Sequence, residues 1–198
     1  ATLGGALLYN VENALAAIAV LRAVDSACPL EALRTFEPAN NPGRGQLYEV
    51  GEAHAFLDYG HNPAAIRSVG AAATAMQPDR TRCVLGVPGD RDETVIRECA
   101  RAASAFDIVY IREDIDKRGR ASGEVASILH EELTRAGTKA LITGTEKESV
   151  EVALAELDRN ELLVVFLDED PTAPETLAAI GARPVGSILR TQATPTRT

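Results

Sequence analysis

The sequence predicts an α/β fold, a three-layer sandwich built on a mostly parallel, Rossmann-like sheet. Short apolar segments alternate along the chain with longer, Ala-rich segments of helical periodicity. This alternation is typical of parallel β-α-β units whose helices cover both faces of a sheet. Right-handed crossovers bring the carboxyl ends of the parallel strands to one edge, where ligands of such sheets bind. Polar residues cluster after three of the predicted strands, at 58–63, 86–93 and 112–120.

The amino-terminal part of the chain has a different pattern. Residues 10–27 are apolar almost all round and predict a buried or doubly packed helix. A second short helix is predicted at 30–36, and the segment 37–45, rich in Pro, Gly and Asn, indicates a linker. Because the chain begins with Ala1 inside a helical pattern, we expect it to be a fragment.

Strands and helices alternate beyond the linker. A pair of strands is predicted at 46–50 and 53–59 around a Gly51-Glu52 turn. Pro63 has a favoured first-turn position in the helix that follows. The other predicted strands lie at 82–86, 108–111, 140–143, 162–167 and 185–189, and the predicted helices at 63–76, 92–106, 122–136, 147–157 and 174–180.

The composition excludes several classes of protein. Of the 198 residues, 45% are hydrophobic and 25% charged, as in soluble globular proteins. The formal net charge of −9 argues against a nucleic-acid partner, which requires clustered Lys and Arg. No membrane partner and a cytoplasmic location are expected, because no membrane-length apolar stretch or signal segment is present. Cys28, Cys83 and Cys99 lack C-x-x-C spacing and are expected to be reduced thiols.

The segment 58–63 (DYGHNP) carries the first candidate site. A carboxylate that ends an apolar strand, such as Asp58, can accept two hydrogen bonds from a ribose diol, and His61 and Asn62 can contact a purine or a phosphate. In the structural alternative, Asp58 and Asn62 cap the helix that begins at Pro63, and His61 is a turn residue. The residues alone favour capping.

Three segments resemble motifs of the Mur-type ligases, in the order and spacing of that family. The segment 58–63 resembles the D-Y-A-H-x-P motif, with Gly60 in place of Ala, and 41–44 (NPGR) resembles the P-G-R signature that joins the central and last domains. The segment 9–17 (YNVENALAA) resembles the H/Y-N-x-x-N-x-L-A-A stretch of the central domain.

The resemblance implies a role for each of these residues. Asp58 would hold the ribose of ATP and His61 would lie near the adenine, together with Asn62. Asn10 and Asn13, three apart on one helix face, would approach the base, although helix capping is their structural alternative. The permanently charged Arg44 suits a transferring γ-phosphate and is the candidate catalytic residue, with a solvated linker residue as the alternative.

The second half of the chain resembles the cyanophycin synthetases within that family. Residues 86–93 (GVPGDRDE) resemble the G-G-P-G-D-R-R-D-E stretch, and 113–120 (EDIDKRGR) with Gly123-Glu124 resemble E-D-x-D-x-R-G-R…G-E. The peptidoglycan ligases carry a D-N-P-R-type signature here, which this chain lacks. Gly86 and Gly89 are predicted to allow a tight turn, and Asp92 to cap the next helix.

These two segments supply the candidate substrate residues. Carboxylates can pair with a guanidinium or ammonium group and arginines with a carboxylate, as an amino-acid substrate requires. A salt-bridged surface loop is the alternative. The predicted substrate residues are Arg91, Glu113, Asp114, Asp116, Arg118 and Arg120.

The resemblance implies the organisation and mechanism of a longer enzyme. Residues 1–40 would be terminal helices of the central domain plus linker, 41–190 the Mur ligase C-terminal domain, and 191–198 a disordered tail. ATP would phosphorylate an acceptor carboxylate and an amine would attack the acyl phosphate, while this domain closes the nucleotide site and presents the amino acid. In cyanophycin synthetases arginine is joined to aspartate side chains.

The chain has no G-x-x-x-x-G-K-[ST] segment, so it is expected to be inactive alone. The resemblance places that loop and the residues that hold Mg²⁺ mainly in the central domain. The implied partners are the remaining domains of the same ligase, a small amino acid and an acidic polypeptide substrate, with homo-oligomerisation left open.

Four other functions are the alternatives to this interpretation. A dinucleotide oxidoreductase requires G-x-G-x-x-G after its first strand, which is absent. A metal hydrolase would need His54, His61 and His130 with Asp58, but these histidines are scattered over separate elements, so no metal site is predicted. A non-catalytic Mur-like nucleotide-binding or assembly module and a ligase for a different amino acid stay open.

Overall fold

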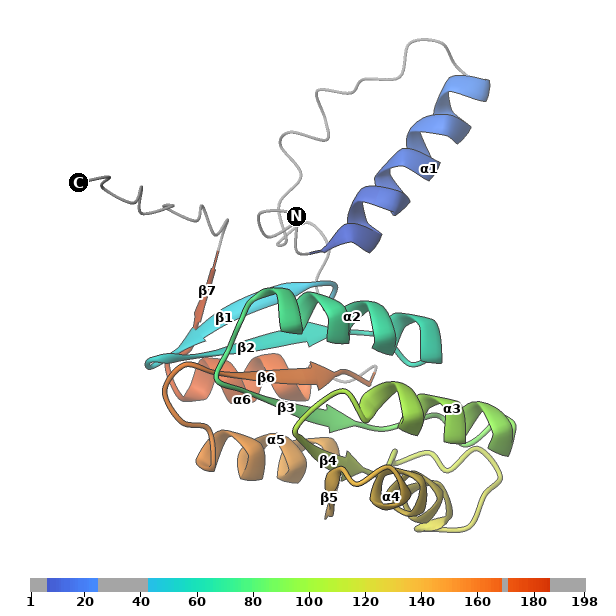
Figure 1. Ribbon diagram of the computed structural model, residues 1–198, viewed down its shortest axis with the longest axis vertical. Helices are drawn as coiled ribbons and strands as arrows, with labels where there is room; N and C mark the ends of the chain where they lie inside the picture. The colour runs from blue at the N-terminus through green and yellow to red at the C-terminus, as the bar shows by residue number, and fades with distance from the viewer. Residues whose placement is uncertain (1–6, 25–42, 169–170, 186–198) are drawn as a thin grey trace, which may run out of the picture.

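A seven-stranded sheet with the order β5-β4-β3-β6-β2-β1-β7 forms the centre of the molecule (Figure 1). The computed structural model describes residues 7–24, 43–168 and 171–185. Strands β2, β6, β3, β4 and β5 pair in parallel, whereas β1 is antiparallel to both β2 and β7. The strands are β1 (Gln46–Val50), β2 (Ala53–Asp58), β3 (Arg80–Leu85), β4 (Ile108–Arg112), β5 (Lys139–Gly144), β6 (Glu161–Phe166) and β7 (Arg183–Pro184).

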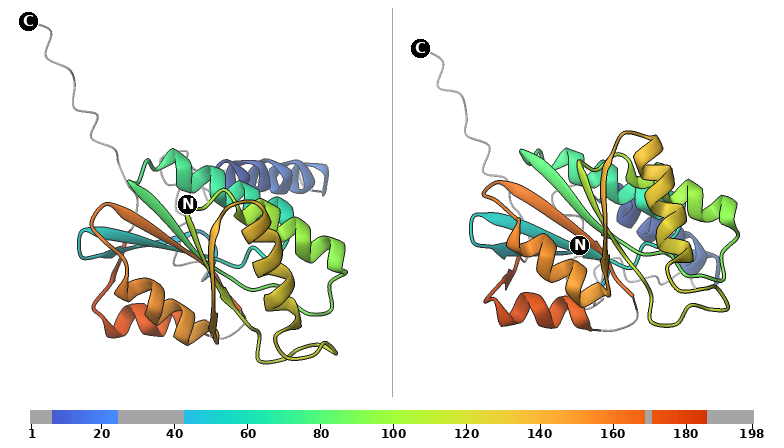
Figure 2. Two further views of the ribbon diagram at one scale, coloured as in Figure 1. Left: turned by 60° about the horizontal axis from the view of Figure 1, so that its bottom comes forward. Right: turned by 90° about the horizontal axis from the view of Figure 1, so that it is seen from below.

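Helices cover both faces of this sheet, which confirms the predicted three-layer α/β sandwich. Helices α2, α3 and α4 lie on one face and α5 and α6 on the other (Figure 1, Figure 2). Ile66, Ile96 and Leu129 of the first group belong to one buried cluster, and Val150 and Leu177 of the second group to another. The helices are α1 (Leu8–Val24), α2 (Pro63–Ala75), α3 (Glu93–Ala103), α4 (Glu124–Arg135), α5 (Glu146–Ala155) and α6 (Thr172–Ala179).

The predicted elements between residues 46 and 180 are all present, with their ends displaced by a few residues. The predicted end strand at 185–189 is wrong in its start, because Arg183 and Pro184 already pair with Glu49 and Tyr48 of β1. The predicted helix at 30–36, most of the linker, the remainder of the end strand and the tail at 191–198 lie outside the described residues.

The expectation that the first helix is buried is wrong. α1 has no buried residue, and it extends away from the sheet with only its first turn near α2 (Figure 1). Its apolar residues are spread around the helix, so contact with one neighbour leaves most of them exposed. The exposed large apolar side chains of α1 are Leu8, Val11, Leu15, Val20, Leu21 and Val24.

The segment between β3 and α3 differs from its prediction in two details. Gly86 and Gly89 have no positive φ, so they are not needed for a left-handed turn. A Cβ at Gly89 would instead stand 2.2 Å from the carbonyl oxygen of Lys117, and one at Gly86 would stand 2.6 Å from Cζ of Arg112. Asp92 is the N-cap residue of α3, but its side chain makes no capping hydrogen bond, so the predicted side-chain cap is wrong.

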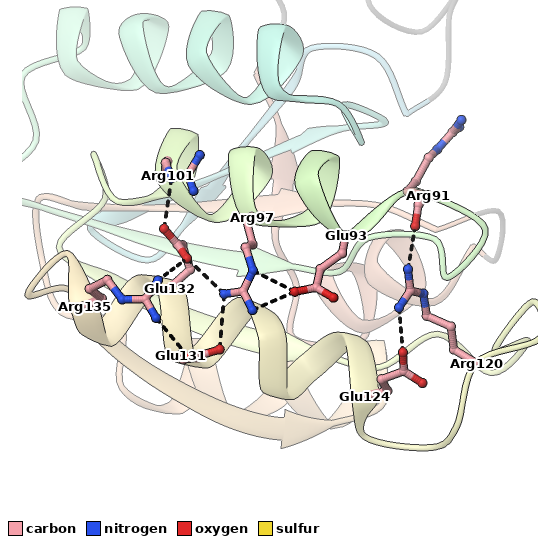
Figure 3. Close-up of polar contacts among 9 residues, drawn as sticks. All are labelled: Arg91, Glu93, Arg97, Arg101, Arg120, Glu124, Glu131, Glu132 and Arg135. Atoms are coloured by element: carbon pink, nitrogen blue, oxygen red, sulfur yellow. Dashed lines mark hydrogen bonds and ion pairs between the residues drawn. The ribbon is translucent and has the colours of Figure 1, made fainter.

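A buried carboxylate joins α3 to α4. Glu132 of α4 accepts hydrogen bonds from Arg97 and Arg101 of α3 and from Arg135 of its own helix (Figure 3). Burial by itself raises the pKa of Glu132, but the hydrogen bonds from Arg97 and Arg101 outweigh it and lower the pKa below its ordinary value. The carboxylate therefore stays ionised and holds the two helices together on one side of the sheet.

Both described cysteines are buried and unpaired. Cys83 lies in β3 and Cys99 in α3, and neither forms a disulfide. Burial raises the pKa of the Cys83 thiol, and it raises the pKa of Cys99 to about 11. Both are protonated, inert thiols at neutral pH, as expected from the sequence, and Cys28 lies outside the described residues.

A pair of glycine substitutions tests the close contact between the segments that follow β3 and β4. Gly89→Ala is expected to destabilise the chain by about 2 kcal/mol, because its Cβ would collide with backbone that cannot rotate away. Gly70→Ala is the control. Gly70 lies inside α2, and a Cβ there would stand 3.8 Å from the Phe106 ring, so the substitution should stabilise the helix by about 0.5–1 kcal/mol. Thermal or urea unfolding measures both, and equal effects would contradict the close contact.

Candidate functional site

The carboxyl ends of β2, β6, β3 and β4 lie side by side at one edge of the sheet. In parallel strands this edge is where the following loops converge, so residues far apart in the sequence meet there. Asp58 ends β2 and Arg112 ends β4. The segments 59–62, 86–92 and 113–123 and residues 167 and 168 extend from the edge.

Asp58 points to the segment that precedes the sheet. Its side chain is only 5% exposed, and Oδ2 accepts hydrogen bonds from the Tyr9 hydroxyl at 3.2 Å and from the backbone N–H of Gly45 at 3.0 Å. Burial raises the pKa of Asp58, and the bonds from Tyr9 and Gly45 oppose that shift. The carboxylate thus links β2, the start of β1 and α1, and it makes no capping bond to α2.

The neighbouring polar residues have different roles. The Oδ1 of Asn62 accepts a hydrogen bond from the backbone N–H of Ala65 at 2.9 Å, so Asn62 caps α2 as the structural alternative predicted. Nδ1 of His61 lies 2.8 Å from the carbonyl oxygen of Tyr59, which fixes its ring at the edge of the sheet. A ligand role for either residue stays a prediction.

A cavity of about 350 Å³ separates α1 from α2 and the end of β2, and we call it the α1–α2 cavity. Four residues that the sequence assigns to ATP line it, although they come from three separate segments. Their side chains offer amide, carboxylate and guanidinium groups in one place. The lining residues are Tyr9, Asn10, Asn13, Arg44, Asp58, Ala65, Ser68 and Val69.

A second cavity of about 330 Å³ lies at the ends of β2, β3, β4 and β6, and we call it the arginine cavity. Arg44 lines both cavities, and its guanidinium lies 5.2 Å from the centre of the Tyr59 ring, within cation–π distance. Four guanidinium groups and one carboxylate line this cavity. The lining residues are Arg44, Tyr59, His61, Pro88, Arg91, Arg112, Arg118, Leu167 and Asp168.

Arg112 also lies at this edge, although its position in the sequence predicts no role for it. It is 4% exposed, and its guanidinium contacts the carboxylates of Asp114, Glu146 and Asp168. Gly86 leaves the space that it occupies. The only signal in the sequence that could have indicated Arg112 is its position at the end of an apolar strand.

The ionic cluster around Arg112 is incompletely paired. Nε of Arg112 and Oε1 of Glu146 are buried without a hydrogen-bond partner among the described residues. Burial raises the pKa of Asp114 and Glu146, and the Arg112 charge opposes both shifts. Glu146 also accepts a hydrogen bond from the backbone N–H of Asp168 at 2.7 Å, so the cluster positions the start of the segment after β6.

The loop after β4 is partly the salt-bridged loop that the sequence analysis gave as an alternative. Glu113 accepts hydrogen bonds from Ser122 and from the backbone N–H of Gly123, and Asp116 accepts one from the backbone N–H of Arg118. Arg91 and Arg118 line the arginine cavity, whereas Glu113, Asp116 and Arg120 do not. The substrate roles of all six residues stay predictions.

The described part of the chain has neither a metal-ion cluster nor a helix of membrane-spanning character. Among residues 7–24, 43–168 and 171–185, no group of three His, Cys, Asp or Glu residues could hold a metal ion. None of the helices in these ranges combines the length and the apolar character that crossing a bilayer requires.

Comparisons with known proteins give a consistent family. A family model described as Mur ligase, glutamate ligase domain, matches residues 43–182. The cyanophycin synthetase of Crocosphaera subtropica is 38% identical over 172 residues, which are 83% of this chain and 20% of that protein. The cyanophycin synthetase of Synechocystis sp. is 34% identical over 192 residues, 93% of this chain and 22% of that protein.

A solved structure shares the fold. The UDP-N-acetylmuramate-alanine ligase of Thermotoga maritima superimposes with a TM-score of 0.65 at 20% identity, over 87% of this chain and 38% of that one. The chain spans about a fifth of the length of the two curated relatives it matches. Because the family model covers more than half of the chain, including all of the residues that line the arginine cavity, the chain belongs to the family of Mur ligase, glutamate ligase domains.

Proposed function

We propose that the chain is the C-terminal domain of an ATP-dependent amide ligase of the cyanophycin synthetase type. In the longer protein it closes the nucleotide site and presents the amino acid. The observation that carries the proposal is the position of Arg44, which lines both the α1–α2 cavity and the arginine cavity. A cation between two cavities suits a reaction in which a phosphate passes from a nucleotide to a second substrate.

The α1–α2 cavity is the proposed nucleotide half of the site. The amides of Asn10 and Asn13 can donate to and accept from a purine, and the carboxylate of Asp58 can accept hydrogen bonds from a ribose. Tyr9 and the Gly45 N–H hold that carboxylate in a fixed orientation, which reduces the entropy lost on binding. His61 and Asn62 stand on the adjoining turn, where His61 faces the arginine cavity.

The arginine cavity is the proposed transfer half. Guanidinium groups bind phosphate and carboxylate oxygens with charge-assisted, often paired hydrogen bonds. We propose that the acceptor carboxylate takes the γ-phosphate of ATP and releases ADP, and that the amine then displaces phosphate from the acyl carbon. Arg44 would stabilise the charge on the transferring phosphate, and Arg91 and Arg118 would hold the carboxylate of the amino acid.

The proposed amine is that of arginine, joined to aspartate side chains of an acidic polypeptide. The similarity to cyanophycin synthetases and the segments 86–93 and 113–120 support this choice. Asp114 and Asp168 hold carboxylates next to the cavity, although Arg112 already contacts both. Mg²⁺ would be held mainly by the other domains of the ligase, which are the proposed partners.

Activity of the full-length protein tests the proposal directly. With ATP, Mg²⁺ and an aspartate-rich primer, release of ADP is expected to depend on added arginine. Lysine and ornithine serve as matched amines. Arginine-independent turnover with another amino acid would indicate a ligase for that substrate, and nucleotide binding without any turnover would indicate the non-catalytic module.

Asp58→Ala in the full-length protein is expected to raise the KM for ATP about tenfold, the effect of losing one good hydrogen bond to a charged group. Tyr110→Phe is the control, because it removes the Tyr110 hydroxyl from its buried hydrogen bonds with Arg82 and Glu156, outside both cavities. It should lower stability and leave the KM for ATP unchanged. A normal KM in Asp58→Ala with reduced stability alone would mean that Asp58 is only structural.

Arg44→Ala is expected to lower kcat roughly 100-fold, the usual cost of removing one group that stabilises transition-state charge. Arg44→Lys keeps the charge without the planar fork and should recover only part of that loss. The control is Arg183→Ala, because Arg183 is exposed and its one ion pair within the described part of the chain is with Glu49 at the surface. An unchanged kcat in Arg44→Ala would assign Arg44 to the linker.

A further inference from the structure

We infer that Arg120 is a positioning residue for Arg91: it fixes the segment 88–92 so that the Arg91 side chain reaches the arginine cavity. The inference rests on the proposed function, in which Arg91 binds the amino acid. It separates two arginines that the sequence assigns to the same role.

The hydrogen bonds of Arg120 are directed into the protein. Its Nε donates to the carbonyl oxygen of Gly89 at 2.8 Å and its Nη2 to the carbonyl oxygen of Arg91 at 2.8 Å. Its Nη1 donates to Glu124 at 2.6 Å (Figure 3). One planar fork therefore ties two carbonyls of the segment after β3 to the first turn of α4. All three guanidinium nitrogens are engaged, and Arg120 does not line the arginine cavity.

The side chain of Arg91 extends in a different direction. It points away from Arg120, which contacts Arg91 only through the backbone carbonyl (Figure 3). The side chain of Arg91 is 43% exposed and has no ion pair shorter than its 4.0 Å contact with Asp90 among the described residues. It lines the arginine cavity and is thus the one of the two that can reach a ligand there.

Other contacts also hold the segments after β3 and β4 close to each other. The close approach of Gly89 to the carbonyl of Lys117 leaves no room for a Cβ, and Arg118 contacts Asp90 at 3.3 Å. Glu124, the anchor of Arg120, also accepts a hydrogen bond from the backbone N–H of Ala121. The hydrogen bond from Arg120 lowers the pKa of Glu124, so the anchor stays charged at neutral pH. The segment 88–92 therefore has little freedom while Arg120 is in place.

A double-mutant cycle in the full-length protein tests the inference. Arg120→Ala is expected to raise the KM for arginine about tenfold, with kcat and the KM for ATP unchanged, because one charge-assisted contact to the substrate is misplaced. In an Arg91→Ala background, the same substitution should change that KM less than twofold. Independent, multiplying effects would show that Arg120 contacts the substrate itself and would overturn the inference.

The conservative variant separates geometry from charge. Arg120→Lys retains the charge but cannot span two carbonyls and a carboxylate, so it should behave like Arg120→Ala. Full recovery by lysine would overturn the inference. Arg135→Ala is the control, since Arg135 is an exposed arginine at the end of α4 whose ion pairs, among the described residues, are with Glu131 and Glu132.

Hydrogen exchange provides a readout that does not depend on activity. In Arg120→Ala, the amides of residues 89–92 are expected to exchange about tenfold faster, while those of β3 and β4 keep their protection. Glu124→Gln should give a smaller effect of the same kind and serves if Arg120→Ala does not fold. Should the full-length protein show no arginine-dependent turnover, the proposed function fails, and unchanged exchange at 89–92 would separately overturn the positioning role.

Discussion

The parallel pairing of β2, β6, β3 and β4 is the constraint on which the site depends. These strands are buried along most of their length, as expected of a parallel sheet with helices on both faces. Once they run in one direction, the residue after each strand must emerge at the same edge. Asp58, Arg112 and the segment after β3 are brought together by this packing.

Buried arginines at the two edges of the sheet differ in how completely they are hydrogen-bonded. At the edge where β3 and β6 begin, Arg82 bonds to Glu161, Tyr110 and Glu156, so its buried charge is well paired. At the opposite edge, the buried Nε of Arg112 has no hydrogen-bond partner in the described part of the chain. A buried ion costs free energy unless it is well hydrogen-bonded, and the three partners of Arg82 meet that requirement. The cluster around Arg112 leaves two polar atoms unsatisfied among the described residues, beside the arginine cavity, which Arg112 also lines.

Rigidity at the second edge comes from backbone contacts between neighbouring loops. The absence of a side chain at Gly89 lets the loop after β4 approach the segment after β3, and Arg120 then bonds to two of its carbonyls. Asp58 is held in a similar way, because the Tyr9 hydroxyl and the Gly45 N–H both donate hydrogen bonds to its carboxylate. In each case a group that does not line the arginine cavity fixes the position of another residue. Arg120 fixes the segment that carries Arg91, and Tyr9 and Gly45 fix the carboxylate of Asp58.

The sequence by itself determined the α/β class, the alternation of elements from β1 to α6 and the motifs at the carboxyl edge, because periodicity and strand-end chemistry are local. Only the tertiary structure decided which polar side chains face a cavity and which are used inside the loops. Arg91 and Arg120 have the same chemistry and similar positions after their strands, yet one lines the arginine cavity and the other bonds to carbonyls. The exposure of α1 and the burial of Arg112 were likewise beyond local pattern, since both depend on what packs alongside.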